Sequence, residues 1–199
     1  MEDQVRCFIA IRPPDAVLDK ILGLMKDFEK KIPNEFIRWC SKEQLHLTLK
    51  FLGNVNESDI EKLQQSIGNS CSGFSQFELT ICGLGCFPVF DFPKIIWLGI
   101  TGETNILRAL QETIEINVCE FGDSKEEREF KPHLTLGRIK NAPRRELFSI
   151  GKGLKVAVSQ VGVIGNWIVR EVLLMQSVLQ PSGAVYNELA KFNLKQKVN

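Results

Sequence analysis

Both histidines of this 199-residue chain lie in one repeated tetrapeptide. The sequence His46-Leu47-Thr48-Leu49 recurs as His133-Leu134-Thr135-Leu136, and each copy stands in an apolar, β-prone setting. A residue type this scarce rarely falls by chance into two identical motifs. The two copies are therefore the first candidates for chemistry.

The alternation of side chains along a β-strand predicts how each copy presents its polar residues. Because successive side chains point to opposite faces, His46, Thr48 and Lys50 should share one face of their strand. In the second copy, His133 and Thr135 should do the same. The opposite, core-facing sides then carry the apolar residues, Leu45, Leu47, Leu49 and Phe51 in the first copy and Leu134 and Leu136 in the second. We expect the two polar faces to meet across one cleft.

Two facing imidazoles suit acid–base catalysis at a phosphodiester. Histidine titrates near neutral pH, so a neutral ring can take a proton from water while a protonated ring gives one to a leaving oxygen. The hydroxyls of Thr48 and Thr135 can donate hydrogen bonds to phosphoryl oxygens, and such donors stabilise the charge that develops in the transition state. This chemistry needs neither a metal ion nor a cofactor.

Other kinds of site fit the sequence less well. A two-histidine metal site would need a carboxylate at a suitable spacing, and Glu43 is a weak match. Cys82 and Cys86 could begin a zinc site, but a closed site needs four ligands and the chain has only two histidines. No cysteine stands out as a nucleophile, and no Gly-x-Ser-x-Gly or Walker-type loop is present. We therefore predict no metal and no cofactor.

The composition is that of an ordinary soluble globular protein. The formal net charge is +1, which excludes a uniformly basic nucleic-acid coat but allows a local basic patch. No apolar run approaches the about 20 residues of a membrane helix, and the apolar stretch 7–11 is too short for a signal peptide. The six cysteines form no C-x-x-C pair and are expected to be free thiols. These features predict a cytoplasmic protein.

The elements that must position the motifs are short strands and amphipathic helices. Asp15 is predicted to cap a helix that runs to about Lys31. Further helices are predicted from Ser58 onward, with Glu61 completing a capping box, and over residues 104–119. Strands are predicted at residues 7–11, 77–82, 95–100, 155–164 and 169–179, besides the two motif strands. This mixture predicts an α+β fold with largely antiparallel sheets. We expect residues 1–199 to form a single two-lobed domain.

The motifs resemble those of the two-histidine (2H) phosphoesterase superfamily, which is named for paired His-x-Thr-x motifs. Within it, the chain is similar to the LigT-like RNA 2′,3′-cyclic phosphodiesterases, also described as 2′-5′ RNA ligases. The resemblance covers nearly the whole length. It rests on Phe8-Ile9-Ala10-Ile11, Arg38-Trp39, His46-Leu-Thr-Leu-Lys-Phe-Leu-Gly53, Phe87-Pro88, Ile96-Trp97-Leu98-Gly99, Lys131-Pro-His-Leu-Thr-Leu-Gly-Arg138, Gln176-Ser177-Val178-Leu179 and Gly183-Ala184-Val185-Tyr186.

The resemblance implies a bilobal α+β fold with two pseudo-symmetric lobes, helices outside and a central cleft that carries both motifs. It also implies metal-independent hydrolysis of a terminal RNA 2′,3′-cyclic phosphate to a 2′-phosphate. On that pattern His46 donates a proton to the departing 3′-oxygen and His133 activates water. Thr48 and Thr135 contact the phosphate, and Arg138 matches a family arginine that neutralises phosphate charge.

Strict alternation conflicts with this role for Arg138, because it places Arg138 on the face opposite His133. A bulge, a strand twist or the strand end must therefore bring its side chain to the cleft. Aromatic side chains can stack on a nucleobase, which adds Phe8 and Trp39 to the candidate substrate-binding residues. The aromatic, loop-like segment 87–93 is a further stacking candidate, and basic residues between positions 140 and 155 could steer RNA.

Two alternative functions stay open from the sequence. The same site could run in reverse, as 2′-5′ RNA ligation, because one site must serve both directions. A non-catalytic nucleotide-binding module is the other alternative, and tight binding of a mononucleotide without turnover would identify it. The expected partners are RNA ends or nucleotides with a 2′,3′-cyclic phosphate. No membrane and no protein partner is indicated, and we expect a monomer.

Overall fold

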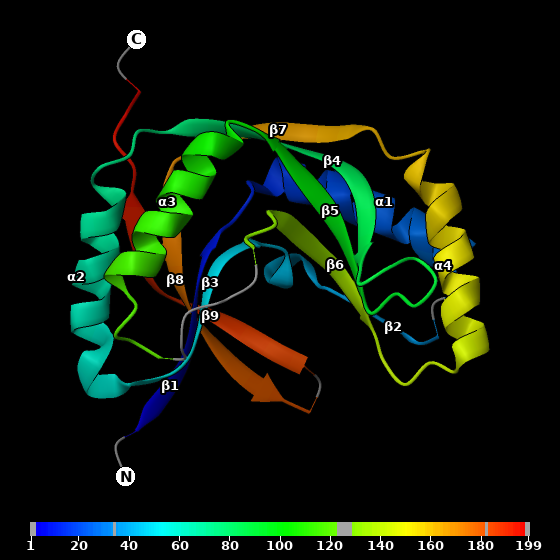
Figure 1. The fold of residues 1–199 in the computed structure, drawn as a ribbon, viewed down its shortest axis with the longest axis horizontal. Coiled ribbons are helices and arrows are strands. Elements are labelled where there is room, and N and C mark those ends of the chain that lie inside the picture. Colours follow the sequence, from blue (N-terminus) through cyan, green and yellow to red (C-terminus); the bar gives the residue numbers. More distant parts are fainter. Residues whose placement is uncertain (1–2, 34, 123–128, 182, 198–199) are drawn as a thin grey trace.

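The computed structural model describes residues 3–33, 35–122, 129–181 and 183–197. Within them, nine strands form one sheet and four α-helices cover it, which confirms the predicted α+β class (Figure 1). The strands are β1 (Gln4–Ile11), β2 (Ile37–Trp39), β3 (Leu47–Asn56), β4 (Phe77–Phe87), β5 (Ile95–Gly102), β6 (His133–Ile139), β7 (Val163–Val169), β8 (Glu171–Gln180) and β9 (Gly183–Asn193). The helices are α1 (Asp15–Lys31), α2 (Ile60–Cys71), α3 (Thr104–Asn117) and α4 (Arg144–Val158), with short 3₁₀ turns at Lys42–Gln44 and Glu57–Asp59.

The sheet consists of two four-stranded halves whose innermost strands carry the two motifs. Along the sheet the order is β7-β4-β5-β6 and then β3-β1-β8-β9, with β2 paired to β6 at the side. The named strand pairs are antiparallel, as predicted. The halves meet where Leu47 of β3 pairs with Leu134 of β6. This junction lies inside the two motifs, so the fold places both histidines at the centre of the molecule.

The helices cover the outer sides of the two halves. Helices α2 and α3 pack on each other, and they lie against β9 and β3 respectively (Figure 1). Helix α1 packs on β7 and α4 packs on β4. Each helix buries an apolar stripe at helical spacing, which for α1 consists of Val17, Leu18, Ile21, Met25 and Phe28. No helix of the described ranges is long and apolar enough to cross a membrane.

Some predicted element boundaries differ from the structure. Pro14 rather than Asp15 is the N-cap of α1, and Asp15 is its first helical residue. Helix α2 begins at Ile60 after a 3₁₀ turn, without the predicted capping box from Ser58. The predicted strand 155–164 was wrong, because α4 extends to Val158 and β7 begins at Val163. The β-branched residues of that stretch favoured a strand, but Ile150 and Leu154 bury a helical face against the sheet.

Candidate active site

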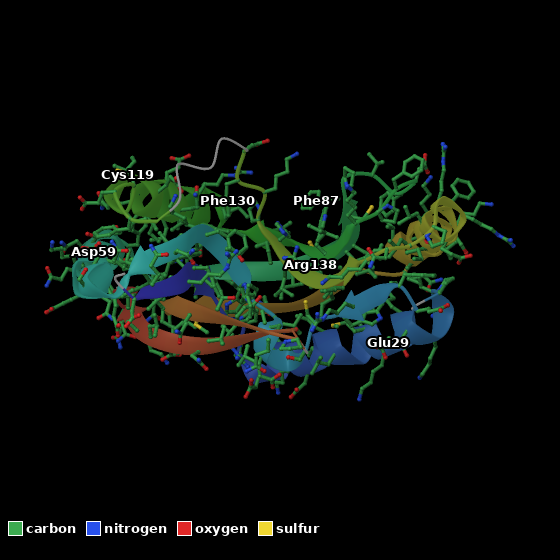
Figure 2. The ribbon with its side chains drawn as sticks, turned by 90° about the horizontal axis from the view of Figure 1, so that it is seen from below. Glu29, Asp59, Phe87, Cys119, Phe130 and Arg138 are labelled. Carbon is green, nitrogen blue, oxygen red and sulfur yellow. The ribbon has the colours of Figure 1, made fainter. Side chains whose placement is uncertain are left out.

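The two histidines stand at matching positions, each at the start of its motif strand. His46 directly precedes β3, and His133 is the first residue of β6, where it pairs with Gly99 of β5. The motif leucines behind them are almost fully buried. Arg138 lies near the middle of the molecule, between α2 and α3 on one side and α1 and α4 on the other (Figure 2). The paired strands therefore anchor both imidazoles at one central position.

Both motif strands contain a β-bulge at the same position of the motif. In β3, Thr48 pairs with Ala10 and Lys50 pairs with Ile9, so Leu49 is the extra residue. In β6, Thr135 pairs with Trp97 and Gly137 pairs with Ile96, which makes Leu136 the extra residue opposite β5. An extra residue reverses the alternation of side chains beyond it. The second leucine of each motif is thus where the strict pattern ends.

The bulge in β6 resolves the conflict over Arg138. Beyond Leu136 the alternation is shifted by one residue, so Arg138 returns to the face that carries His133 and Thr135. Its side chain is exposed, and its register partner in β2 is Arg38. Two guanidinium groups therefore stand on the motif face of this half. Gly183 of the β8–β9 hairpin lies so close to the Arg38 guanidinium that a Cβ there would overlap it.

The predicted faces of Lys50 and Phe51 were wrong, because the bulge in β3 reverses both. Lys50 turns into the core, where its exposed fraction is 4%, and its Nζ lies 2.7 Å from a carboxylate oxygen of Glu115 on α3. Phe51 turns out of the core and is 61% exposed. Gln111 of α3 donates a hydrogen bond of 3.4 Å to the carbonyl of Leu49, the bulged residue. Phe51 thus takes the place in the first motif that Arg138 takes in the second.

His133 is held by one hydrogen bond and two aromatic rings. Its Nδ1 lies 2.6 Å from the carbonyl oxygen of Lys131, which can only accept, so Nδ1 carries the proton. The ring centroid lies 5.1 Å from that of Phe87 and 6.2 Å from that of Trp97. Because Nδ1–H is committed to the carbonyl, Nε2 has the free lone pair of the neutral ring. This is the state required of a general base.

His46 has an equivalent environment in the other half. It hydrogen-bonds to the backbone of Gln44, again two residues upstream. Its ring stacks on Phe8 with centroids 4.8 Å apart, and Tyr186 of β9 meets it edge-on at 5.3 Å. Phe8 itself is only 3% exposed, so the structure places it beneath the histidine as a support. Each imidazole is therefore fixed by a carbonyl and a pair of aromatic rings.

Burial and positive charge keep both imidazoles neutral. Burial lowers the pKa of His46 to about 4, with smaller contributions in the same direction from the charges of Arg138, Arg12 and His133, and the hydrogen bond to Gln44 opposes them. The pKa of His133 is also lowered, first by burial and then by Arg138, against the hydrogen bond to Lys131. An anionic ligand between the two rings would act in the opposite direction on each pKa.

The remaining predicted residues lie around this centre. Thr48 and Thr135 are half-buried on the motif faces. Trp39 of β2 is half-buried and pairs with Gly137, and a Cβ at that glycine would lie 3.1 Å from the Trp39 ring. Trp39 therefore packs beside the bulge of β6. Among the described residues, no three His, Cys, Asp or Glu side chains are grouped so that they could hold a metal ion.

Three residues near the two histidines were not predicted from the sequence as site residues. They are Phe51, Tyr186 and Arg38. The sequence did contain a signal for Phe51. It lies five residues after His46, just as Arg138 lies five residues after His133. Tyr186 and Arg38 reach the site through the β8–β9 hairpin and the β2–β6 pairing, which no local pattern predicts.

Comparison with known proteins identifies the family of this chain. The model of the LigT like Phosphoesterase family matches residues 11–97, which include the first motif. A curated relative from Aeropyrum pernix is 35% identical over 74% of this chain and 80% of its own length. A second, from Methanothermobacter thermautotrophicus, is 29% identical over 96% of this chain and its own full length. Both relatives are named RNA 2′,3′-cyclic phosphodiesterase.

Solved structures have the same fold. A Thermus thermophilus protein is 28% identical, with a TM-score of 0.75 over 97% of this chain and all of its own. Escherichia coli LigT, crystallised with 3′-AMP, is 24% identical with a TM-score of 0.75 over 98% of this chain and all of its own. The chain belongs to the LigT-like phosphoesterase family.

Proposed function

We propose that this protein hydrolyses the terminal 2′,3′-cyclic phosphate of RNA to a 2′-phosphate without a metal ion. The proposal is carried by the pair of imidazoles. Each is hydrogen-bonded to the backbone of the residue two positions upstream and lies beside a motif threonine and Arg138. The names of the curated relatives support the substrate and favour hydrolysis over ligation.

In the proposed reaction His133 is the general base. Its Nε2 takes a proton from a water molecule as the water oxygen attacks phosphorus. The bond between phosphorus and the 3′-oxygen breaks, and protonated His46 gives its proton to that oxygen. The products are a 3′-hydroxyl and a 2′-phosphate. A turnover therefore moves one proton onto His133 and one off His46, and solvent restores both.

Binding of the phosphate favours the protonated form of His46 that this reaction needs. Thr48 and Thr135 donate hydrogen bonds to its non-bridging oxygens, and the Arg138 guanidinium balances the charge that grows on them. In the unliganded protein the low pKa of His46 keeps its ring neutral. The negative phosphate raises that pKa, so substrate binding and uptake of the catalytic proton are coupled.

Phe51 is the proposed platform for the terminal base. It is an exposed ring on the motif face, and its centroid lies 6.2 Å from that of Phe8, which in turn supports His46. An aromatic face binds any base by stacking, which suits an enzyme that acts on RNA ends of varied sequence. The cation Arg138 and the ring Phe51 then hold the two ends of one nucleotide.

The decisive experiment follows the phosphorus at the RNA terminus. Purified protein is incubated with an RNA that ends in a 2′,3′-cyclic phosphate, in excess chelator, and the product is identified by phosphorus NMR. We expect a 2′-phosphate, and no conversion by the His46→Ala and His133→Ala variants. A 3′-phosphate product would reverse the assigned leaving oxygen, and a lack of conversion by the unmodified protein would refute the function.

The assembly and compartment proposed with this function are a monomer in the cytoplasm. The site is complete within one chain, because both motifs, Arg138 and the supporting rings come from the same molecule. Sedimentation equilibrium measures the mass, and a mass near 22.5 kDa is the expected result.

A further inference from the structure

Positive charge is concentrated in the segment that follows Arg138. The whole chain has a net charge of +1, but residues 138–155 contain six basic residues and a single acidic one, Glu146. The basic residues are Arg138, Lys140, Arg144, Arg145, Lys152 and Lys155. The rest of the chain therefore carries a small net negative charge. An anionic partner would be attracted to this part of the molecule first.

Helix α4 arranges three of these basic side chains and a phenylalanine along one exposed stripe. Arg144, Phe148, Lys152 and Lys155 follow one another at intervals of four, four and three residues, and all are exposed. Phe148 is 48% exposed, and the Lys152 Nζ lies 4.9 Å from its ring centroid. Ile150 and Leu154, on the other side of the helix, are buried. The helix thus presents cations and an aromatic ring together.

The loop between β4 and β5, residues 88–94, lies along this helix (Figure 1). Gly151 of α4 approaches the Phe90 carbonyl so closely that a Cβ there would overlap it. Asp91 accepts a hydrogen bond of 2.7 Å from the Lys155 Nζ. Phe92 is 40% exposed, and the Arg144 guanidinium lies 5.3 Å from its ring centroid. A second exposed ring is therefore fixed beside the stripe before any partner binds.

The same loop connects the stripe to the active site. Phe87, at its first end, contacts His133. At its other end, the Lys94 backbone N–H donates a 2.7 Å hydrogen bond to the Phe87 carbonyl, and Ile95 is the register partner of Arg138. A molecule bound between the histidines and Arg138 can therefore continue onto the loop and α4 without leaving the surface.

We propose that α4 and the 88–94 loop bind the single-stranded RNA that precedes the terminal nucleotide. This inference rests on the proposed function, because that function places the RNA 3′ end in the site. Alternating cations and aromatic rings are the features that bind single strands, the cations contacting phosphates and the rings stacking on bases. From Arg144 to Lys155 the stripe is about 16 Å long. That length accommodates roughly three to five nucleotides.

The test compares a long and a short ligand by binding, without relying on turnover. The ligands are a ten-nucleotide RNA that ends in a 2′-phosphate and adenosine 2′-monophosphate. In the double variant Arg144→Ala/Lys152→Ala we expect the Kd for the RNA to rise about tenfold and the Kd for the mononucleotide to change less than twofold. The slope of log K against log salt for the RNA should fall by about 1.4, for two lost phosphate contacts.

A matched control removes two exposed lysines elsewhere. Lys26→Ala/Lys62→Ala takes the same charge from α1 and α2 and should leave both Kd values unchanged. Phe148→Leu keeps an apolar side chain without the ring face, and it should weaken RNA binding while leaving the mononucleotide unaffected. Unfolding midpoints near that of the unmodified protein establish that each variant is folded.

Several outcomes would overturn the proposal. They are equal affinity of the unmodified protein for both ligands, equal losses for both ligands in the α4 variant, or an RNA affinity that the α4 variant retains. The last outcome would assign the stripe to a partner other than RNA. Failure of the proposed function is a separate result, since it appears as a lack of turnover of the cyclic-phosphate RNA whatever its length.

Discussion

His46 and His133, the proposed proton donor and acceptor, lie in an environment that disfavours protonation. Burial dominates the lowering of both pKa values, and neighbouring positive charges add to it. A catalyst that needs one protonated and one neutral histidine is most populated at a pH between the two pKa values. With both values below the ordinary 6.5, that pH lies on the acidic side of neutrality.

The pH dependence of catalysis follows from this. We expect kcat/KM, which reports the free enzyme, to reach its maximum below pH 6.5. The kcat profile, which reports the complex, should lie at higher pH because the bound phosphate raises both pKa values. Initial rates between pH 4 and 9 measure the two profiles. Coincident profiles centred above pH 7 would contradict the coupling of phosphate binding to proton uptake.

Arg138 lowers the pKa values of both histidines, and we propose that it also binds the transition state. Replacement of Arg138 by glutamine should raise the pKa of both histidines, since a nearby positive charge is lost. Proton NMR can follow this directly, because the chain has only two histidines. We also expect kcat to fall about 10²–10³-fold, the usual cost of losing one donor to a developing oxyanion. Arg145→Gln on α4 is the matched control, and an equal effect there would refute the assigned role.

Replacement of Phe51 tests its proposed role as the stacking platform for the terminal base. Phe51→Leu keeps the side chain apolar but removes the stacking face, and we expect kcat/KM for an RNA substrate to fall about tenfold. Stability should be little changed because the ring is 61% exposed. Ile116→Ala, at another exposed apolar position on α3, should have no effect on kcat/KM. If Phe51→Leu retains full kcat/KM, the platform must lie elsewhere.

At the scale of elements, α3 holds the bulge that exposes Phe51. Lys50 and Glu115 form an ion pair of 2.7 Å in which both side chains are almost fully buried. Gln111 of the same helix binds the carbonyl of the bulged Leu49. Two side chains of α3 therefore contact β3 at the bulged residue and at the residue that follows it. The helix thereby fixes a feature of the active site that it does not itself line.

Removal of one partner of this pair should be strongly destabilising. Glu115→Ala leaves the Lys50 ammonium buried without its counter-ion, and we expect the free energy of unfolding to fall by about 3–5 kcal/mol. Denaturant titration measures the loss. Glu171→Ala is the control, because Glu171 and Lys191 form a 3.1 Å pair at the surface, worth about 1 kcal/mol or less. Similar losses in the two variants would show that burial of the first pair is unimportant.

Secondary-structure elements show most clearly what could and could not be predicted from the sequence. The repeated motif, its two strands and the first helix followed from the sequence, because hydrophobic spacing and a rare residue type are local signals. The bulges did not, since an extra residue is defined by its partner strand, and Lys50 and Phe51 were therefore assigned to the wrong faces. Helix α4 was missed because its β-branched end favoured a strand and its packing partner, β4, is distant in sequence.

At the scale of the whole molecule, the neutral histidines link stability to pH. The unfolded chain has ordinary histidines that take up protons near pH 6.5, whereas the folded chain resists them to lower pH. The histidine contribution to stability is therefore complete above about pH 6.5 and is lost as the pH falls toward the folded values.

This linkage can be isolated by double replacement. Between pH 7 and pH 5, the free energy of unfolding of the unmodified protein should fall more steeply than that of His46→Asn/His133→Asn, since asparagine does not titrate. We also propose that the two-lobed chain unfolds in a single transition, because the two halves share the Leu47–Leu134 junction. Parallel slopes, or two separate transitions, would contradict these expectations.

The equivalent bulges in β3 and β6 give the two halves one repeated frame, with an imidazole, a hydroxyl and a sixth residue in the same places. A ribose with a cyclic phosphate has two chemically similar bridging oxygens. Because the two halves are equivalent, the frame alone does not determine which of these oxygens leaves. The two halves differ at the residue five positions after the histidine, which is Phe51 in one half and Arg138 in the other, and we expect this difference to set the direction. If the proposed function is correct, the choice of which oxygen leaves follows from these two side chains, because they are where the two otherwise equivalent halves differ.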